Sequence, residues 1–352
     1  MTTVQLTQGA GGQAMQDFLK QHVLNSLRYS SFPKQDLSLE DLDDASAIQD
    51  IAFTTDSYTI KPLSFPGGDI GTLSVAGTVN DLVVVGAEPI ALSLGLILEE
   101  GLLISTLEAI MSSIGSVSRS CGVPVITGDT KVVERGSVDE MIINTSGLGI
   151  RSPLLDQNFM RVRETRPIES RWVKDSNLKE DDLVIVSGNI GDHGVSLLSF
   201  REGYGFEANG LASDIAPLNE MVVDCLKAGG IVAMKDPTRG GLADALNEWS
   251  HKSGCGILVE EERIPIRDSV TSACEMLGLD PLEIGNEGKI IIGVVAEAAD
   301  DLLSELRRHP EGKESAIIGR ATKASKSVVL QTTIGGQRII EAPLGDPIPR
   351  IC

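Results

Sequence analysis

The residues best suited to chemistry in this 352-residue chain are aspartates that border apolar segments. They are Asp44, Asp56, Asp81 and Asp129, and Mg²⁺ binds such carboxylates together with nucleotide phosphates and water. Asp81 is the most informative, because its neighbours are apolar and a carboxylate there needs a partner or a metal ion to offset its desolvation. A helix cap or a salt bridge is the alternative role, and it is the stronger alternative for Asp43.

Three further features could contact a phosphate group. Gly9, Gly11 and Gly12 belong to a Gly-Ala-Gly-Gly stretch whose backbone N–H groups could approach an anion, although a flexible N-terminal arm would have the same composition. Arg239 opens a predicted helix, where the helix N–H groups and the guanidinium could form an anion site. Lys131 follows a predicted turn and could neutralise a developing phosphate, or could be an ordinary surface lysine.

The last residue, Cys352, could carry a substrate in covalent form. A thiolate is a good nucleophile, and the three prolines among the preceding residues predict an extended segment. Twelve extended residues span roughly 40 Å, far enough to move the thiol between two sites. The terminal carboxylate on the same residue disfavours the thiolate, and we expect Arg350 to offset this in part.

Two other side chains could move protons. Glu287 precedes an apolar run and could act as a general base, or could cap a turn. His193 lies at a predicted helix start and could act in catalysis or hold a loop together.

Composition excludes several classes of protein. A formal net charge of −20 repels nucleic-acid phosphates and anionic lipid. No apolar stretch approaches the roughly 20 residues that cross a bilayer, and the first residues lack the features of a secretory signal. The five cysteines form no C-x-x-C pair, which argues against a zinc site or a disulfide framework. We therefore expect a cytoplasmic enzyme with no nucleic-acid or membrane partner.

The elements that must position these residues alternate between strand and helix patterns, as in two domains. We predict an N-terminal domain over residues 1–150, a polar linker region over 151–180 and a C-terminal domain over 181–340. Residues 341–352 are predicted to form a flexible tail.

Within the first domain, hydrophobic spacing places the aspartates on particular elements. A strand over 47–56 should end at Asp56, and a helix over 70–86 should carry Asp81. A strand over 123–127 should lead into the turn that presents Asp129 and Lys131. Further strands are expected over 90–98, 140–149, 182–187, 255–260, 289–296, 316–320 and 327–340, and helices over 103–120, 217–228 and 298–308 and after Gly194 and Arg239.

Together these segments resemble the HypE family of [NiFe]-hydrogenase maturation factors. That family belongs to the superfamily of aminoimidazole ribonucleotide synthetase, selenophosphate synthetase and thiamine-monophosphate kinase. The matching segments are IAFTTDS (51–57), FPGGDIG (65–71), GTVNDL (77–82), GDTKVV (128–133), GDHG (191–194), DPTRGGL (236–242), NEGK (286–289) and PRIC (349–352). The C-terminal PRIC is highly specific, whereas the glycine stretch departs from the family's His-Gly-Ser-Gly-Gly and lacks its histidine and serine.

The resemblance implies an α+β fold with two PurM-like domains: an N-terminal mixed β-sheet domain with helices, and a C-terminal α/β sandwich domain. It also implies a homodimer in which the N-terminal sheets pair and the ATP site forms at their interface. The N-terminal domain would bind ATP and form the dimer, and the tail would carry the cysteine.

The implied activity is ATP-dependent dehydration of a carbamoyl group on the thiol of Cys352 to a thiocyanate. A HypF-type carbamoyltransferase would supply the carbamoyl group, and the cyano group would pass to iron on a HypC–HypD scaffold. Mg²⁺ and the ATP phosphates would be held by Asp56, Asp81 and Asp129, with Asp44 less certain. Lys131 would stabilise the oxygen that is phosphorylated, and Glu287 would take the nitrogen proton.

Two other functions agree with part of the sequence. A small-molecule ATP-dependent synthetase or kinase of the same superfamily would share the aspartates and glycines, but not the tail that ends in cysteine. A non-catalytic maturation scaffold would use Cys352 only for docking.

Overall fold

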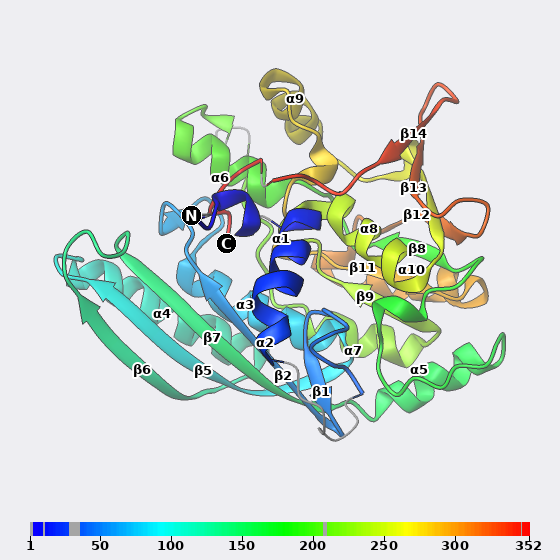
Figure 1. Cartoon of the computed structure of the whole chain (residues 1–352), viewed down its shortest axis with the longest axis horizontal. Helices are drawn as coiled ribbons and strands as arrows, with labels where there is room; N and C mark the ends of the chain where they lie inside the picture. Colours follow the sequence, from blue (N-terminus) through cyan, green and yellow to red (C-terminus); the bar gives the residue numbers. More distant parts are fainter. Residues whose placement is uncertain (1–2, 10, 28–35, 207–209, 346) are drawn as a thin grey trace.

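The computed structural model describes residues 3–9, 11–27, 36–206, 210–345 and 347–352, so Ala10 of the glycine stretch lies outside the described residues. Two large β-sheets lie side by side, each packed against helices (Figure 1). This arrangement is the predicted two-domain α+β architecture. A small third sheet pairs β3 (Ser64–Phe65) with β4 (Gly68–Asp69).

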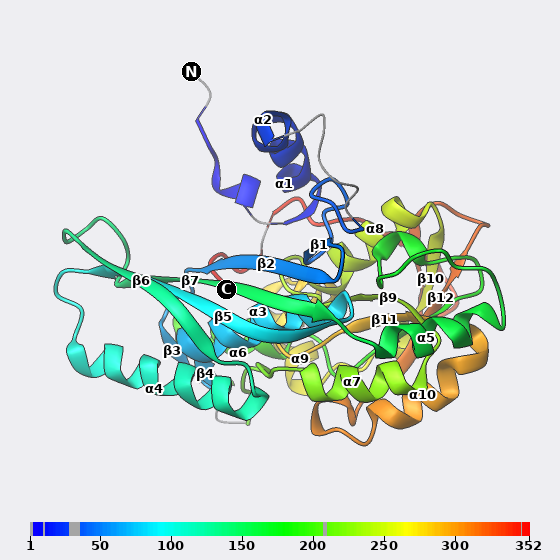
Figure 2. The same cartoon turned by 90° about the horizontal axis from the view of Figure 1, so that it is seen from below.

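The first sheet has five strands in the order β1-β2-β7-β5-β6. Their bounds are β1 (Ser46–Ile48), β2 (Ile51–Tyr58), β7 (Met141–Arg151), β5 (Ala87–Glu99) and β6 (Val125–Val133). Buried residues alternate with exposed ones along most of β2 and with partly buried ones along most of β7, as expected where one sheet face packs on a core. Figure 2 shows helix α4 (Ile104–Cys121) running along one face of this sheet, with α3 (Ile70–Val84) next to it.

Helix α3 lies between the two domains. Fourteen of its fifteen residues are buried, which agrees with its apolar composition all around the helix. Asp69 caps its first turn by accepting a hydrogen bond of 2.7 Å from the Thr72 N–H. The predicted helix over 70–86 is therefore confirmed, and it carries Asp81 among buried neighbours.

Two predictions for the first sheet are wrong. The segment 47–56 is not one strand, because Gln49 adopts a positive φ of 57° and turns the chain between β1 and β2. Asp56 consequently lies inside β2 rather than at its end. The expected turn after residue 127 is absent as well, because β6 continues through Gly128 and Asp129. Gly128 allows this pairing, since an added Cβ would lie 2.2 Å from the Leu94 carbonyl oxygen.

The second sheet has seven strands in the order β14-β13-β10-β12-β8-β11-β9. Their bounds are β14 (Gln337–Ile340), β13 (Val328–Gln331), β10 (Gly256–Glu260), β12 (Ala316–Thr322), β8 (Leu183–Val186), β11 (Ile291–Val294) and β9 (Ile231–Lys235). The helices around it are α5 (Leu154–Arg163), α6 (Asp192–Glu202), α7 (Asn219–Ala228), α8 (Gly241–Ser253), α9 (Asp268–Leu277) and α10 (Ala299–Leu306). Strand β9 and helix α9 were not predicted.

The expected linker region over 151–180 contains helical structure and packs against the second domain. It contains α5, and its side chains Leu155, Phe159 and Trp172 are at most 1% exposed within the core of the second domain. The polar composition of this segment concealed these apolar positions, because they are separated by charged surface residues.

The tail is docked in this structure, in contrast to the predicted flexible segment. Ile348 and Ile351 are 1% and 2% exposed, and they pack against α6 and the core of the first domain. Figure 1 places the C-terminus near the middle of the molecule. The tail therefore folds back between the two domains instead of extending into solvent.

The described N-terminal residues form a helix that was also not predicted, α1 (Gly12–Phe18), followed by the short α2 (Asn25–Leu27). Figure 2 shows both on the side of the molecule where β1 and α8 lie. Within the described part of the chain, no helix combines the length and the apolar character required to traverse a bilayer.

Candidate active site

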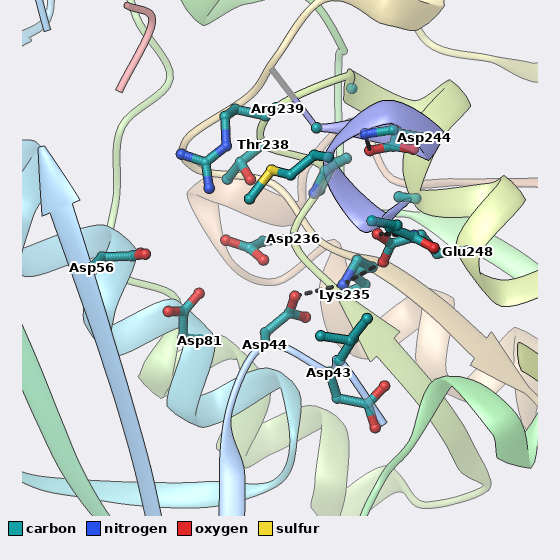
Figure 3. A pocket seen from close by; sticks show the side chains of 18 of the residues that line it. Asp43, Asp44, Asp56, Asp81, Lys235, Asp236, Thr238, Arg239, Asp244 and Glu248 are labelled. Carbon is teal, nitrogen blue, oxygen red and sulfur yellow. Dashed lines mark hydrogen bonds and ion pairs between the residues drawn. The ribbon is translucent and has the colours of Figure 1, made fainter. Parts of the chain in front are cut away.

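A pocket of about 270 Å³ lies where the two domains meet (Figure 3). Side chains from β2 and α3 form one wall, and the segment after β9 forms the other. The start of α1 contributes Gly11, Gly12 and Met15. Most of its charged lining residues are acidic: Asp43, Asp44, Asp56, Asp81, Asp236, Asp244 and Glu248.

Four aspartates from four different elements point toward one region of this pocket (Figure 3). Asp56 lies on the face of β2 that is turned to α3, and Asp81 lies on α3 itself. Asp236 follows β9 directly, and Asp44 precedes β1 by two residues. The structure thus brings together three of the predicted metal ligands, and it adds Asp236, which the sequence analysis did not select.

The acidic groups strongly perturb one another. Burial raises the pKa of Asp81 well above its ordinary value, and the charges of Asp56 and Asp236 raise it further. Burial and the Asp44 carboxylate raise the pKa of Asp236 to about 8. These pKa values are raised because several carboxylates are buried close together, where their negative charges repel one another. A bound divalent cation would reduce this repulsion. Carboxylate oxygens from several elements are also the donors that Mg²⁺ prefers, so the residues fit this ion.

Asp44 has a partner within the protein. Its Oδ1 lies 2.5 Å from Nζ of Lys235, which also lies 3.0 Å from Oε2 of Glu248. Burial nevertheless raises the pKa of Asp44 to about 6. Asp43 similarly pairs with Lys252 at 3.0 Å, so the salt-bridge alternative describes both residues.

The sequence analysis missed Lys235, Asp244 and Glu248. Lys235 ends an apolar strand immediately before the DPTRGGL segment, and a lysine at such a position could have been selected. Asp244 and Glu248 lie one turn apart on α8 and had no distinguishing pattern.

Arg239 contacts the predicted carrier thiol. Its Nη1 lies 3.4 Å from Sγ of Cys352, and the guanidinium points into the pocket (Figure 3). The Cys352 charge is the main cause that raises the pKa of Arg239 above its ordinary value. Arg350 does not take this position, contrary to expectation. It donates to Asp139 at 2.6 Å and to the Thr59 carbonyl at 2.7 Å.

Asn286 holds the loops of this site together. Its Nδ2 donates to the Pro237 carbonyl, and its Oδ1 accepts from the Gly191 N–H at 2.8 Å. Because Asn286 is completely buried, these bonds fix the loop that carries Arg239 relative to Glu287.

Glu287 is a buried carboxyl that is 4% exposed. Its Oε1 has no hydrogen-bond partner among the described residues. Burial raises its pKa well above the ordinary value, with further contributions from Asp236 and Asp214, whereas Arg239 lowers it. Once ionised, a carboxylate in this environment is a stronger base than an ordinary glutamate, and the Arg239 charge favours the ionised form that the predicted general base requires.

Asp129 and Lys131 lie outside the pocket of their own chain. Asp56 is opposite Thr145, Thr145 is opposite Leu94, and Leu94 is opposite Gly128. Three strand spacings therefore separate β2 from β6, about 14 Å. The Asp129 and Lys131 side chains are mostly exposed and form a salt bridge with each other at 3.2 Å. One chain thus cannot place Asp129 on the same ion as Asp56.

The glycine stretch is divided. Gly11 and Gly12 line the pocket with φ angles of 82° and 66°, whereas Gly9 is exposed and does not line it. The Gly12 N–H donates to Oδ2 of Asp244 at 2.8 Å, so a carboxylate occupies the position expected for an anion. An added Cβ on Gly12 would lie 2.3 Å from the Pro343 carbonyl oxygen, which explains the glycine there.

His193 contacts the tail, so of its two possible roles the structure shows the structural one. The side chain is fully buried, and its Nε2 lies 2.9 Å from the carbonyl oxygen of Ile351. Nδ1 lies 2.8 Å from Oγ of Ser213.

Comparison with known proteins agrees with this geometry. Family models of AIR synthase related proteins match residues 42–151 as the N-terminal domain and 179–331 as the C-terminal domain. The carbamoyl dehydratase HypE of Rhizobium leguminosarum bv. viciae is 42% identical, covering 99% of this chain and 95% of the relative.

Two solved structures are similar over nearly their whole lengths. A HypE in complex with ATP superimposes with a TM-score of 0.79 at 39% identity, covering 99% of this chain and 100% of that one. A chain of a HypE–HypF complex gives a TM-score of 0.81 at 40% identity, with coverages of 92% and 100%. This chain therefore has the two-domain PurM-like fold and belongs to the HypE family of carbamoyl dehydratases, in the AIR synthase superfamily.

Proposed function

We propose that this protein uses ATP to dehydrate a carbamoyl group carried on the thiol of Cys352, producing a thiocyanate. The observation that carries the proposal is the position of that thiol, 3.4 Å from Arg239 at the edge of an acidic pocket. A terminal cysteine that only docked to another protein would not need this contact with a guanidinium that lines the pocket. The similarity to a HypE solved with ATP supports the choice of nucleotide.

The reaction has two bond-breaking stages. ATP first transfers its γ-phosphoryl group to the oxygen of the S-carboxamide, releasing ADP while the nitrogen loses one proton. The C–O bond then breaks as phosphate leaves, the second nitrogen proton departs, and the C≡N bond is complete. Phosphorylation replaces a poor leaving group by a good one, and the sulfur remains bonded to carbon throughout.

The pocket aspartates suit the nucleotide end of this reaction. We propose that Asp56, Asp81 and Asp236 hold Mg²⁺, which when bound would neutralise phosphate charge. Asp44, already paired with Lys235, would act through the surrounding charge network. Gly11 and Gly12 lie on the lining of the same pocket and would contact the phosphates there, with the Gly12 N–H exchanging its Asp244 partner for a phosphate oxygen.

Arg239 and Glu287 suit the thiol end. In the docked tail Arg239 would stabilise negative charge that develops beside the sulfur during the ATP-dependent step, since a guanidinium at this distance lowers the energy of an adjacent anion. Glu287 would accept a proton from the nitrogen, because its buried Oε1 is unpartnered among the described groups.

We further propose a homodimer that brings Asp129 and Lys131 to the partner's pocket. The face of the first sheet opposite α3 and α4 exposes apolar side chains, among them Ile51 at 54%, Phe53 at 51% and Ile150 at 42%. Strand β6 forms the edge of the same sheet. Pairing of two such sheets would cover the apolar face, and Lys131 would then contact the oxygen that is phosphorylated in the other chain.

We propose a separate role for each of the two domains and for the tail. Residues 1–150 would form the ATP-binding and dimerisation domain, residues 181–340 the PurM-like C-terminal domain, and residues 341–352 the carrier tail. A HypF-type carbamoyltransferase would load the thiol, as the HypE–HypF complex of a relative suggests. A HypC–HypD complex would then receive the cyano group as a ligand for the iron of a [NiFe]-hydrogenase.

Mass spectrometry of the C-terminal peptide tests the proposal. After loading by the transferase with ATP and carbamoyl phosphate, and removal of the nucleotide, we expect a carboxamide adduct on Cys352 that loses one water when ATP is added again. A non-hydrolysable ATP analogue, added after loading, should leave the carboxamide unchanged. Adduct formation without conversion would contradict the dehydratase function, and the absence of any adduct in the presence of active transferase would contradict the carrier role.

A further inference from the structure

The tail docks on helix α6, at a site that is separate from the nucleotide pocket. His193, at the start of α6, contacts the backbone of the tail rather than the thiol. Its ring is fully buried, so each ring nitrogen needs a partner. Nε2 donates its hydrogen to the Ile351 carbonyl, because a carbonyl can only accept, and Nδ1 accepts from the Ser213 hydroxyl in the neutral ring.

Two other residues of α6 also contact the docked tail. Gly194 follows His193, and a Cβ added there would lie 3.0 Å from Cδ1 of Ile351 and 3.1 Å from Cδ1 of Ile348. Ile284 lies nearer still, at 2.5 Å, so the missing side chain leaves space that Ile284 and the two tail isoleucines share. Arg201, further along α6, donates to the carbonyls of Pro349 and Arg350 at 2.8 and 3.1 Å.

We propose that His193 is a positioning residue that holds the tail in the docked state, as a latch. It thereby sets the balance between two processes: loading of the thiol by a transferase and the ATP-dependent dehydration. If the tail leaves, the Nε2–H must exchange the Ile351 carbonyl for water, so the docked state is favoured by the net free energy of this hydrogen bond. Docking places the thiol next to Arg239 for the ATP-dependent step, whereas loading by another protein requires the thiol to be accessible. This inference rests on the proposed carrier function of Cys352.

If His193 acts as this latch, weakening it should affect modification of the thiol and the ATP-dependent conversion in opposite directions. Weakening it should expose Cys352 more often and speed its modification by large reagents or by a transferase. The same change should slow the ATP-dependent conversion, because the thiol lies beside Arg239 less often. A substitution that merely damages the fold would not speed modification of Cys352 by a transferase while slowing the ATP-dependent conversion.

The test uses the full-length protein and substitutions at His193 and Ser213. His193→Phe keeps an aromatic ring but removes the donor, and should raise the rate of Cys352 labelling by a polyethylene-glycol maleimide about tenfold. His193→Gln retains an N–H near the Nε2 position and should restore most of the protection. Ser213→Ala releases the constraint on Nδ1 and should give an intermediate rate. Ser196→Ala, on the same helix but bonded to Pro66 rather than the tail, is the matched control.

Hydrogen exchange gives a second readout that needs no carbamoyl chemistry. The Thr59 N–H donates to the Cys352 carbonyl at 3.1 Å, so this amide reports tail docking from the first domain. It should exchange faster in His193→Phe and at the normal rate in Ser196→Ala. Unchanged labelling and unchanged Thr59 exchange in His193→Phe would overturn the latch.

These measurements remain distinct from the test of the proposed function. If the wild-type adduct never converts to thiocyanate, the dehydratase proposal fails while the labelling and exchange results still decide whether His193 latches the tail. If His193→Phe does not fold, the Ser213→Ala labelling rate decides alone, and a rate equal to that of Ser196→Ala overturns the proposal.

Discussion

The Nη1 atom of Arg239 and the Sγ atom of Cys352 lie 3.4 Å apart, although 113 positions separate these residues in the chain. The contact exists because the segment after β9 and the docked tail meet at the same edge of the pocket. It gives the terminal thiol a cationic neighbour where the nearby aspartates and the terminal carboxylate would otherwise oppose ionisation. Arg239 is therefore placed to decide how reactive Cys352 is at neutral pH.

Replacing Arg239 by Gln should raise the thiol pKa of Cys352 by about one unit, the scale expected for loss of one adjacent charge. Because only the thiolate reacts, iodoacetamide alkylation at pH 7.5 should slow about tenfold, and the rates should converge at high pH. The measurement is the pH profile of Cys352 alkylation without nucleotide. Arg163→Gln, which removes an exposed positive charge on α5, should leave the profile unchanged. An identical profile in Arg239→Gln would show that the contact does not activate the thiol.

Asp81→Asn should separate nucleotide binding from thiol reactivity. The amide keeps the size of the side chain and a contact to Thr54, whose Oγ1 lies 2.8 Å from Asp81 Oδ2. Loss of the charge should weaken Mg²⁺-dependent ATP binding roughly 10- to 100-fold, as is typical of changes around metal sites. Calorimetric titration measures this effect, with Asp156→Asn on the exposed face of α5 as control. Alkylation of Cys352 should stay within about twofold of wild type; an equal loss in both assays would indicate a folding defect.

The pH dependence of stability should reveal the acidic pocket. A carboxyl with the ordinary pKa of 3.8 is ionised in the unfolded chain at neutral pH, whereas folded Asp236 has a pKa of about 8. Between these values the folded state binds more protons, so the free energy of unfolding falls as pH rises from about 4 to 8. The melting temperature of the metal-free protein should therefore drop between pH 6 and pH 8, by about 2–4 °C for each kcal/mol lost.

Two additions to that experiment identify the cause. Asp236→Asn cannot ionise, so its melting temperature should fall less steeply over the same range. Mg²⁺ with ATP should stabilise the wild type more at pH 8 than at pH 6, because cation binding requires ionised carboxylates. Parallel pH profiles for wild type and Asp236→Asn would mean that other groups cause the loss.

The sequence was informative where chemistry and local pattern agreed. An aspartate within a continuous apolar helix pattern identified Asp81 as unusual, and the structure places it in the pocket. Lys235 was missed because its importance comes from its ion pairs with Asp44 and Glu248. These two residues belong to distant segments that only strand and helix packing bring together. The prolines of the tail predicted an extended, flexible segment, but its docked position could not be predicted, because Ile348 and Ile351 pack into apolar space that only the assembled domains create.

Asp129 and Lys131 show the limit of selecting site residues from local sequence patterns and a family resemblance. Both were assigned to the same site as Asp56, yet sheet register holds them about 14 Å apart in one chain. The assignment can hold only if a second chain supplies them. This requirement leads to a test of both the dimer and the shared site.

Mixing two inactive variants should restore activity if each site uses residues from two chains. Lys131→Ala removes the contribution of β6, and Asp81→Asn removes that of the pocket, so each variant alone should fail in the ATP-dependent conversion. In a mixed dimer one site carries both substitutions and the other carries neither. Random exchange makes half of the dimers mixed, so about a quarter of the wild-type activity should return. Conversion of the carboxamide, followed by mass spectrometry after subunit exchange, measures it. Lys323→Ala, at an exposed salt bridge in the second domain, should leave homodimers fully active. If the mixture stays inactive although mixed dimers have formed, Lys131 acts within its own chain or not at all.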